Sequence, residues 1–440
     1  MTEANLVALG AERLAAVLMA AAEDDPTLKR RLRMELASEV GPEDLAAEIA
    51  KRLTAIEGRR SRVHWRKYRA FAQDLDLQRA MIAGPLAAQD PKLALTLLWR
   101  FLALADAAMG QVDDSKGQVE ATFRQAVADL GEVAARAGPD PEALAEQIVV
   151  ALEDDGERLL DGLAAALVPA LSPAGLIALR TRLQASFQGR SRPPPTIAAA
   201  LREVADAQGD VEGYIAAIPA SEARQPGAGA EIARRLLAAG RTEDALAALT
   251  RSAPPPQAST LLPGVQVWED VYLDALEADG QSELAQEIRW GAFERRLAAD
   301  RLRAYLKRLP DFDDVEAEER ALAHAVAFTD FSEALTFLTQ WPAAASAARL
   351  VLTRAGAIDP HRTELIDLAA RLLEARHPLA ATLLLRAAVA DTLRWSRAER
   401  LKDAQRQLAE IESLAVQIAD WGGFETHEDF MARLRNIRRA

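Results

Sequence analysis

The sequence contains no cysteine among its 440 residues and only five histidines. The absence of cysteine excludes disulfide bonds, thiolate zinc sites and cysteine nucleophiles, and it favours a protein of the reducing cytoplasm. The histidines never lie three or four positions apart, so no two of them can share a helical face as zinc ligands. We therefore predict no metal site and no cofactor.

The sequence also lacks long apolar runs. The richest one, residues 93–104, is interrupted by Arg100 and falls short of the roughly 20 residues that span a bilayer as a helix. The first residues carry acids where a secretion signal needs a basic region, and Glu12 and Arg13 interrupt their apolar stretch. We predict that no segment enters a membrane, and we expect a cytoplasmic protein.

Motifs of known chemistry are missing too. Gly227 and Gly229 have no third glycine at the spacing of a dinucleotide-binding loop, and no Gly-x-Ser-x-Gly sequence is present. Residues 113–117 (Asp-Asp-Ser-Lys-Gly) lack the alternating ligands of an EF-hand and the Gly-Lys ending of a P-loop, so we interpret them as a capped loop before a helix. An enzyme with an unrecognised site is our weakest hypothesis for the function.

Strong helix formers dominate the sequence, half of which is apolar, and runs of β-branched residues with alternating polarity are absent. This composition predicts an all-α protein. Five dipeptides fit helix starts, because an Asp or Ser side chain can accept a hydrogen bond from a free N–H while proline occupies the first helical position. These dipeptides are Asp25-Pro26, Asp90-Pro91, Asp140-Pro141, Ser172-Pro173 and Asp359-Pro360.

One helix-turn-helix pattern occurs twice, between residues 231 and 294. The positions that recur forty residues apart are Gly240 and Gly280, Thr242 and Ser282, Glu243 and Glu283, and Ala245 and Ala285. The glycine can end a helix in the left-handed conformation, the hydroxyl residue can cap the next helix, and the alanine allows the two helices to pack closely. Such hairpins bury their apolar faces by stacking on neighbours, so we predict an α-solenoid of the tetratricopeptide or HEAT kind.

The chain is too long for one compact globule, and its clearest linker contains the proline triplet 193–195. We predict an N-terminal helical domain over residues 1–187, a proline-rich linker over 188–196 and a C-terminal helical-repeat domain over 197–440.

Several segments resemble a known family. They are residues 8–14, 65–69, 97–102, 112–117 and 399–404. Together they resemble an uncharacterised family of bacterial all-helical proteins that is defined only as a domain of unknown function. The order of these features is also distantly similar to the helical tail that follows the SWIM zinc finger in other proteins. The resemblance implies helical repeats and a cytoplasmic location, but no activity. Because the chain has no cysteine, it cannot carry the zinc finger itself.

The one strongly basic stretch is residues 59–69, which holds six positive residues and no acid. Its aromatic residues Trp65 and Tyr68 could stack on bases while the arginines bind phosphates. The interpretation that we favour is a solvated helix face whose arginines pair with the acidic zone 113–161. The candidate binding residues of the basic stretch are Arg59, Arg62, His64, Trp65, Arg66 and Lys67.

Our leading hypothesis is a scaffold or adaptor that binds an unidentified protein or peptide on stacked hairpins. Its alternative is an accessory protein of nucleic acids that uses the basic stretch, although the net charge of −13 opposes binding of nucleic acid by the whole surface. The acids between Asp311 and Glu319 are typical of a helix start, with docking of a basic partner as the alternative. The sequence does not specify an oligomeric state.

Overall fold

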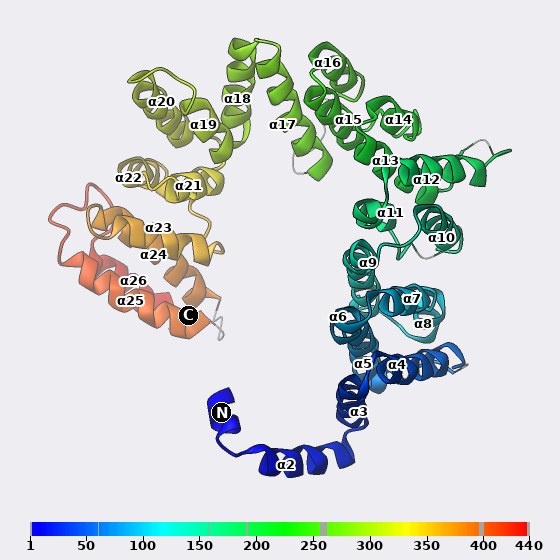
Figure 1. Cartoon of the computed structure of the whole chain (residues 1–440). Coiled ribbons are helices and arrows are strands. Elements are labelled where there is room, and N and C mark those ends of the chain that lie inside the picture. Colours follow the sequence, from blue (N-terminus) through cyan, green and yellow to red (C-terminus); the bar gives the residue numbers. More distant parts are fainter. Residues whose placement is uncertain are drawn as a thin grey trace. The chain divides into compact units, whose positions relative to one another are not determined.

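The computed structural model describes residues 2–59, 61–156, 158–190, 192–255, 262–395 and 400–437. Over these residues the chain forms helices joined by turns and loops, without any strand (Figure 1). The predicted all-α class is therefore confirmed. The chain divides into two compact units, residues 1–275 and 276–440.

The helices of the first unit are α1 (Glu3–Val7), α2 (Ala11–Asp24), α3 (Pro26–Val40), α4 (Pro42–Glu57), α5 (Tyr68–Met81), α6 (Ala87–Gln89), α7 (Pro91–Leu102), α8 (Ala105–Gln111), α9 (Gln118–Ala137), α10 (Pro141–Glu153), α11 (Leu163–Leu167), α12 (Pro173–Ser186), α13 (Pro195–Gln208), α14 (Val211–Ala216), α15 (Pro226–Ala238) and α16 (Thr242–Arg251). The division between the units falls within α17 (Pro263–Ala278). The second unit contains α18 (Ser282–Arg296), α19 (Ala299–Leu306), α20 (Asp313–Ala327), α21 (Phe331–Gln340), α22 (Ala344–Thr353), α23 (Thr363–Leu373), α24 (Pro378–Arg394), α25 (Leu401–Ala415) and α26 (His427–Ile437).

Four of the five predicted helix starts are confirmed. Asp25, Asp90, Asp140 and Ser172 each precede a helix that begins with proline, and each side chain accepts a hydrogen bond from a backbone N–H of the first turn. The prediction for Asp359-Pro360 is wrong. Asp359 instead accepts a hydrogen bond from the N–H of His361 at 2.9 Å, which closes a turn, and α23 begins only at Thr363.

The turn that the repeat predicts is found at Gly240 and Gly280, which have φ angles of 72° and 78°. In each turn the N–H after the glycine bonds to the carbonyl five residues earlier, at 2.8 Å for both Arg241 and Gln281. The same turn occurs at Gly209, where Asp210 bonds to the carbonyl of Ala205 at 2.9 Å. A third hairpin, α13 with α14, therefore shares this turn.

The alanines of the repeat are buried, since Ala245 and Ala285 are both 0% exposed. The hydroxyl residues, however, do not cap the second helices as we expected. Thr242 and Ser282 are already the first helical residues, and the preceding residue makes no capping bond through its side chain. The arrangement of the hairpins as an α-solenoid stays a prediction.

Each unit has its own core. In the first unit one apolar cluster extends from Met34 to Val204, and a second, between Ala205 and Ala275, holds α15 and α16 together. Within the larger cluster, α7 packs on α9, where the rings of Phe101 and Phe123 lie 5.1 Å apart. The core of the second unit extends from Phe293 to Leu434.

The proline-rich stretch 188–196 lies within the first unit rather than between the two. Beyond it, Ile197, Ala200 and Val204 of α13 join the same core as the helices before it. Ser191 lies outside the described residues. The division into domains 1–187 and 197–440 therefore stays a prediction.

Within the described residues, no single helix is long and apolar enough to cross a membrane. Among the same described residues, one pair of neighbouring helices, α7 and α8, is long and apolar enough when taken together, and the pair is bent by 44° at its junction.

Candidate functional site

The basic stretch is anchored by its backbone near its middle and again through Tyr68 near its end. The backbone anchor is Val63, which is buried and donates its N–H to the carbonyl of Gln111, at the end of α8, over 2.7 Å. The side chain of Gln111 in turn donates to the carbonyls of Ile56 at 3.0 Å and Arg59 at 3.3 Å. These bonds hold the loop between α4 and α5 against the end of α8.

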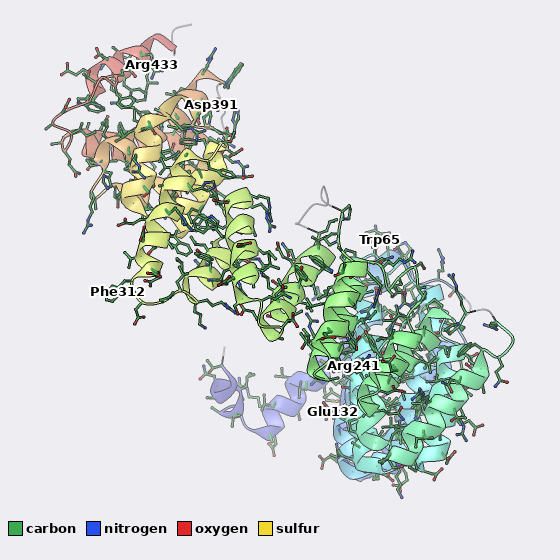
Figure 2. All side chains as sticks on the ribbon, turned by 90° about the horizontal axis from the view of Figure 1, so that it is seen from above. Trp65, Glu132, Arg241, Phe312, Asp391 and Arg433 are labelled. Carbon is green, nitrogen blue, oxygen red and sulfur yellow. The ribbon has the colours of Figure 1, made fainter. Side chains whose placement is uncertain are left out.

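A short 3-10 helix, Trp65–Lys67, follows this anchor and leads directly into α5. It begins at His64, whose ring nitrogen Nδ1 accepts a hydrogen bond from the N–H of Arg66 at 3.4 Å. The tight turn separates the two aromatic residues of the stretch. Tyr68 enters the core, whereas Trp65 stays 73% exposed at the periphery of the first unit (Figure 2).

Tyr68 has a structural role. Its hydroxyl donates a hydrogen bond to Asp114 and accepts one from the N–H of Gln118 at 3.2 Å. Burial raises the pKa of Tyr68, and its hydrogen bond to Asp114 adds to the rise. Asp114 also accepts hydrogen bonds from the N–H groups of Val119 and Glu120 at 3.1 and 2.8 Å. Residues 113–117 are therefore a capped loop before α9, as predicted.

The remaining side chains of the stretch form a basic surface, which we define as Arg62, His64, Trp65, Arg66 and Lys67. All five are exposed. The guanidinium carbon of Arg66 lies 5.1 Å from the centre of the Trp65 ring, and the imidazole of His64 lies 5.7 Å from the same ring. The surface therefore combines a flat aromatic ring with positive charge.

Among the described residues, the ion pairs that we predicted between this stretch and the acidic zone 113–161 are absent. Within the described part of the chain, Arg62, Arg66 and Lys67 make no ion pair with any acid. Arg59 is half-buried, and its Nε donates to the carbonyl of Ser61 at 3.2 Å, so it belongs to the loop rather than to the surface. Arg60 lies outside the described residues.

A second candidate surface, which the sequence did not single out, lies on helices α1 to α3. Of the described side chains of α2, only Ala22 is buried. Large apolar side chains of these helices, and of the turn between α1 and α2, are left in solvent, at Leu6, Val7, Leu9, Val17, Leu18, Met19, Leu36 and Val40. Val7 and Met19 are both 68% exposed, and Val40 is 74% exposed. We call these eight residues the N-terminal apolar set.

The spacing of Leu14, Leu18 and Ala22 indicates one apolar helical face, but such a face is usually covered by the protein itself. The sequence can predict that α2 is amphipathic, but it cannot predict that the apolar face of α2 is left exposed. In the structure α3 packs against α2, but Leu18 of α2 is still 42% exposed. Helix α3 therefore covers this face only in part.

The other candidates have structural explanations. Asp313, Asp314 and Glu316 lie in the first turn of α20, where the helix dipole favours acids, as predicted. The imidazole of His324 contacts the carbonyl oxygen of Glu294 at 2.9 Å, and the imidazole of His361 lies 3.5 Å from the carboxylate of Asp391. Each of these two histidines therefore has its own partner. Among the residues that the structure describes, no cluster of His, Asp or Glu could hold a metal ion.

Comparison with known protein families shows a match that covers most of the chain. A model described as "Family of unknown function (DUF6880)" matches residues 1–196 and again residues 185–439. The two matches overlap over 185–196, around the predicted linker, and together they cover nearly the whole chain. No curated protein and no solved structure matches the chain.

Proposed function

The chain belongs to the family of unknown function DUF6880, and from this premise we propose that it is a scaffold or adaptor that binds a protein or peptide partner. The observation that carries the proposal is the N-terminal apolar set. Large apolar side chains that cluster in solvent mark sites of protein contact, because each one exposed costs hydrophobic free energy that a partner can recover.

The chemistry of α2 supports a partner that is a protein. An amphipathic helix commonly binds by placing its apolar face in a groove of its partner. The sequence of α2 contains three acids, Glu12, Glu23 and Asp24, and one cation, Arg13, and a helix of net negative charge is repelled by anionic lipid and by nucleic acid. A groove on another protein is therefore the surface that fits α2 best.

The proposal also includes the finer features that the sequence suggests. We propose that the shared turns at Gly209, Gly240 and Gly280 join hairpins of an α-solenoid of the tetratricopeptide or HEAT kind, because stacked hairpins build long binding surfaces. A cytoplasmic location, a bacterial origin and a distant likeness to the helical tail of SWIM zinc finger proteins complete this proposal.

Photo-crosslinking in cells tests the proposed surface. A photoreactive amino acid in place of Met19 should give a discrete crosslinked species that contains a second protein, because Met19 lies on the proposed contact. The same amino acid at Gln184, an exposed polar position on α12, serves as the control and should give none. A crosslink from Gln184 alone, or none from Met19, would remove the support for α2 as the contact.

The basic surface favours a second candidate function, the binding of single-stranded nucleic acid. Trp65 could stack on a base, while Arg62, Arg66 and Lys67 carry charges that no acid of the described chain neutralises. The acidic zone and the net charge of −13 oppose this binding, so we rank it second.

Retardation of a single-stranded oligonucleotide tests this second candidate. If it is correct, replacing Arg62, Arg66 and Lys67 by alanine should weaken binding and reduce the salt slope by about one for each lost phosphate contact. The matched control replaces Lys29, Arg33 and Lys51, three exposed cations of the first unit, and removes the same charge. An equal loss in both variants would show that the basic surface has no special role.

A further inference from the structure

A cavity of about 550 Å³ opens between α7, α8 and α10 of the first unit. Its size lies within the range of pockets that bind ligands. Four of the residues that line it are acids, namely Asp106, Glu146, Asp154 and Asp155, and none is basic. Two other cavities of the first unit are lined by both acids and arginines, so the exclusively negative charge distinguishes this cavity from them.

Helix α10 supplies one wall of the cavity through its exposed side. Glu146, Val150 and Asp154 are spaced by four residues, so they form one stripe along the helix. The opposite side of α10, with Leu144 and Ile148, is buried in the core. Val150 is 53% exposed, although it is an apolar residue of a helix whose other side is buried in the core.

The carboxylates of the cavity lack positive partners. Asp106, Glu146 and Asp154 make no ion pair within the described residues. Asp155, only 8% exposed, is held in place by the N–H groups of Leu159 at 2.9 Å and Leu160 at 3.0 Å. Burial raises the pKa of Asp155 against the effect of these two bonds, and the nearby charges of Asp161 and Asp106 add to the rise. A cation in the cavity would relieve this crowding of negative charge.

The indole of Trp99 adds a third feature. Trp99 lines the cavity, and its Nε1–H is buried without a hydrogen-bond partner in the described part of the chain. A buried donor without a partner destabilises the fold. The indole ring can also attract a cation placed over its face.

We propose that this cavity binds a lysine or arginine side chain that a peptide segment of the partner presents among apolar residues. The apolar walls at Trp99 and Val150 suit the aliphatic stem of such a side chain, and the carboxylates suit its charged end. The proposal rests on the protein-binding function above and specifies the chemistry of the partner. The cavity and the apolar face of α2 are different contact surfaces. Helix α2 would insert into a groove of the partner, whereas the cavity would receive a side chain of the partner.

The test measures binding of a labelled peptide of leucines and lysines by fluorescence anisotropy, with a leucine–glutamate peptide as the negative probe. The cavity variant is Glu146→Gln with Asp154→Asn, both of which are exposed side chains, so the fold should not change. We expect the dissociation constant of the lysine peptide to rise at least tenfold, while the glutamate peptide does not bind.

The control variant removes the same charge elsewhere. Glu39→Gln with Glu132→Gln changes two exposed acids of the first unit that make no ion pair within the described residues, and it should change the affinity less than twofold. Glu132 is labelled in Figure 2. Equal weakening in both variants would mean that only net charge matters, and it would overturn the proposal. Affinity for free argininamide as high as for the peptide would also overturn it, in favour of a site for small cations.

Two further results separate this proposal from the general function. Self-association that the cavity variant abolishes would assign the cavity to a second copy of the chain and would contradict the proposal. If Met19 still crosslinks to a protein while the lysine peptide binds both variants equally, the inference about the cavity fails and the scaffold function stands. If Met19 gives no crosslink but binding of the lysine peptide needs the cavity acids, the scaffold function loses its support and the inference about the cavity stands.

Discussion

Close packing at single residues explains how short helices of this chain hold together. At Gly131 of α9 an added Cβ would lie 2.3 Å from the carbonyl oxygen of Ala166 at the end of α11, so the two backbones meet where only glycine fits. The contact involves backbone atoms and cannot be relieved by rotation of a side chain.

Replacing Gly131 by alanine should therefore lower the free energy of unfolding by at least about 1–3 kcal/mol, as overpacking does in other cores. Chemical denaturation measures this change. Gly110 of α8 is the matched control, because an added Cβ meets no atom within 4 Å there. Alanine at Gly110 should stabilise its helix slightly, by about 0.5–1 kcal/mol. Similar effects at both positions would contradict the close approach of α9 and α11.

Residues of the candidate site show the limit of what spacing alone predicts. Trp65 and Tyr68 lie three apart, a spacing that commonly places two side chains on one face of a helix. A 3-10 helix and the anchor at Val63 turn the chain between them, so only Tyr68 enters the core. Likewise, the excess of acids in 113–161 suggested partners for the arginines, but acids such as Asp129 pair with Arg79 instead.

Helices and turns were more predictable from the sequence, because their signals are local. An Asp or Ser before proline marked four helix starts, and glycine in the left-handed conformation marked two hairpin turns. Asp359 satisfies the same local rule but closes a turn, because the helix begins later at Thr363. The exposure of α2 and the cavity beside α10 depend on what the rest of the chain leaves uncovered, and no local pattern predicts that.

The start of the second unit depends on one carboxylate. Glu277 accepts hydrogen bonds from Ser282 at 2.7 Å and from the buried Arg289 at 2.7 Å, and Arg308 lies 3.2 Å away. The bond from Ser282, then the bond and charge of Arg289, lower the pKa of Glu277 below its usual value. Its ionised form therefore stabilises the fold at neutral pH.

Replacing Glu277 by glutamine should reduce the free energy of unfolding by about 1–3 kcal/mol at pH 7, because the positive charge of buried Arg289 loses its partner. The stabilisation by Glu277 is complete above the unfolded pKa of about 4.3 and is lost as the pH falls through the lower folded pKa. The difference between variant and native protein should thus shrink below about pH 4. Glu287→Gln, an exposed acid of α18, is the control. A difference that does not change with pH would refute the ionic role of Glu277.

At the scale of the whole molecule, two compact units carry different features. The first unit, residues 1–275, holds the N-terminal apolar set, the basic surface and the acidic cavity. The second unit has a continuous core from Phe293 to Leu434, and it also exposes large apolar side chains, including Phe312, Trp395 and Val416. Because the proposal assigns the contact to α2, binding of a partner should depend chiefly on substitutions in the first unit.

The central claim is that the chain binds a protein and does so through α2. The most direct measurement is quantitative affinity capture from cells, with nuclease present, of the native chain and of two variants. One variant replaces Val17 and Met19 by glutamate, and the other replaces Arg62, Arg66 and Lys67 by alanine. We predict a partner protein that resists nuclease, persists with the basic-surface variant and is lost with the α2 variant. A partner that nuclease removes, and that needs Arg62, Arg66 and Lys67 but not α2, would contradict the claim.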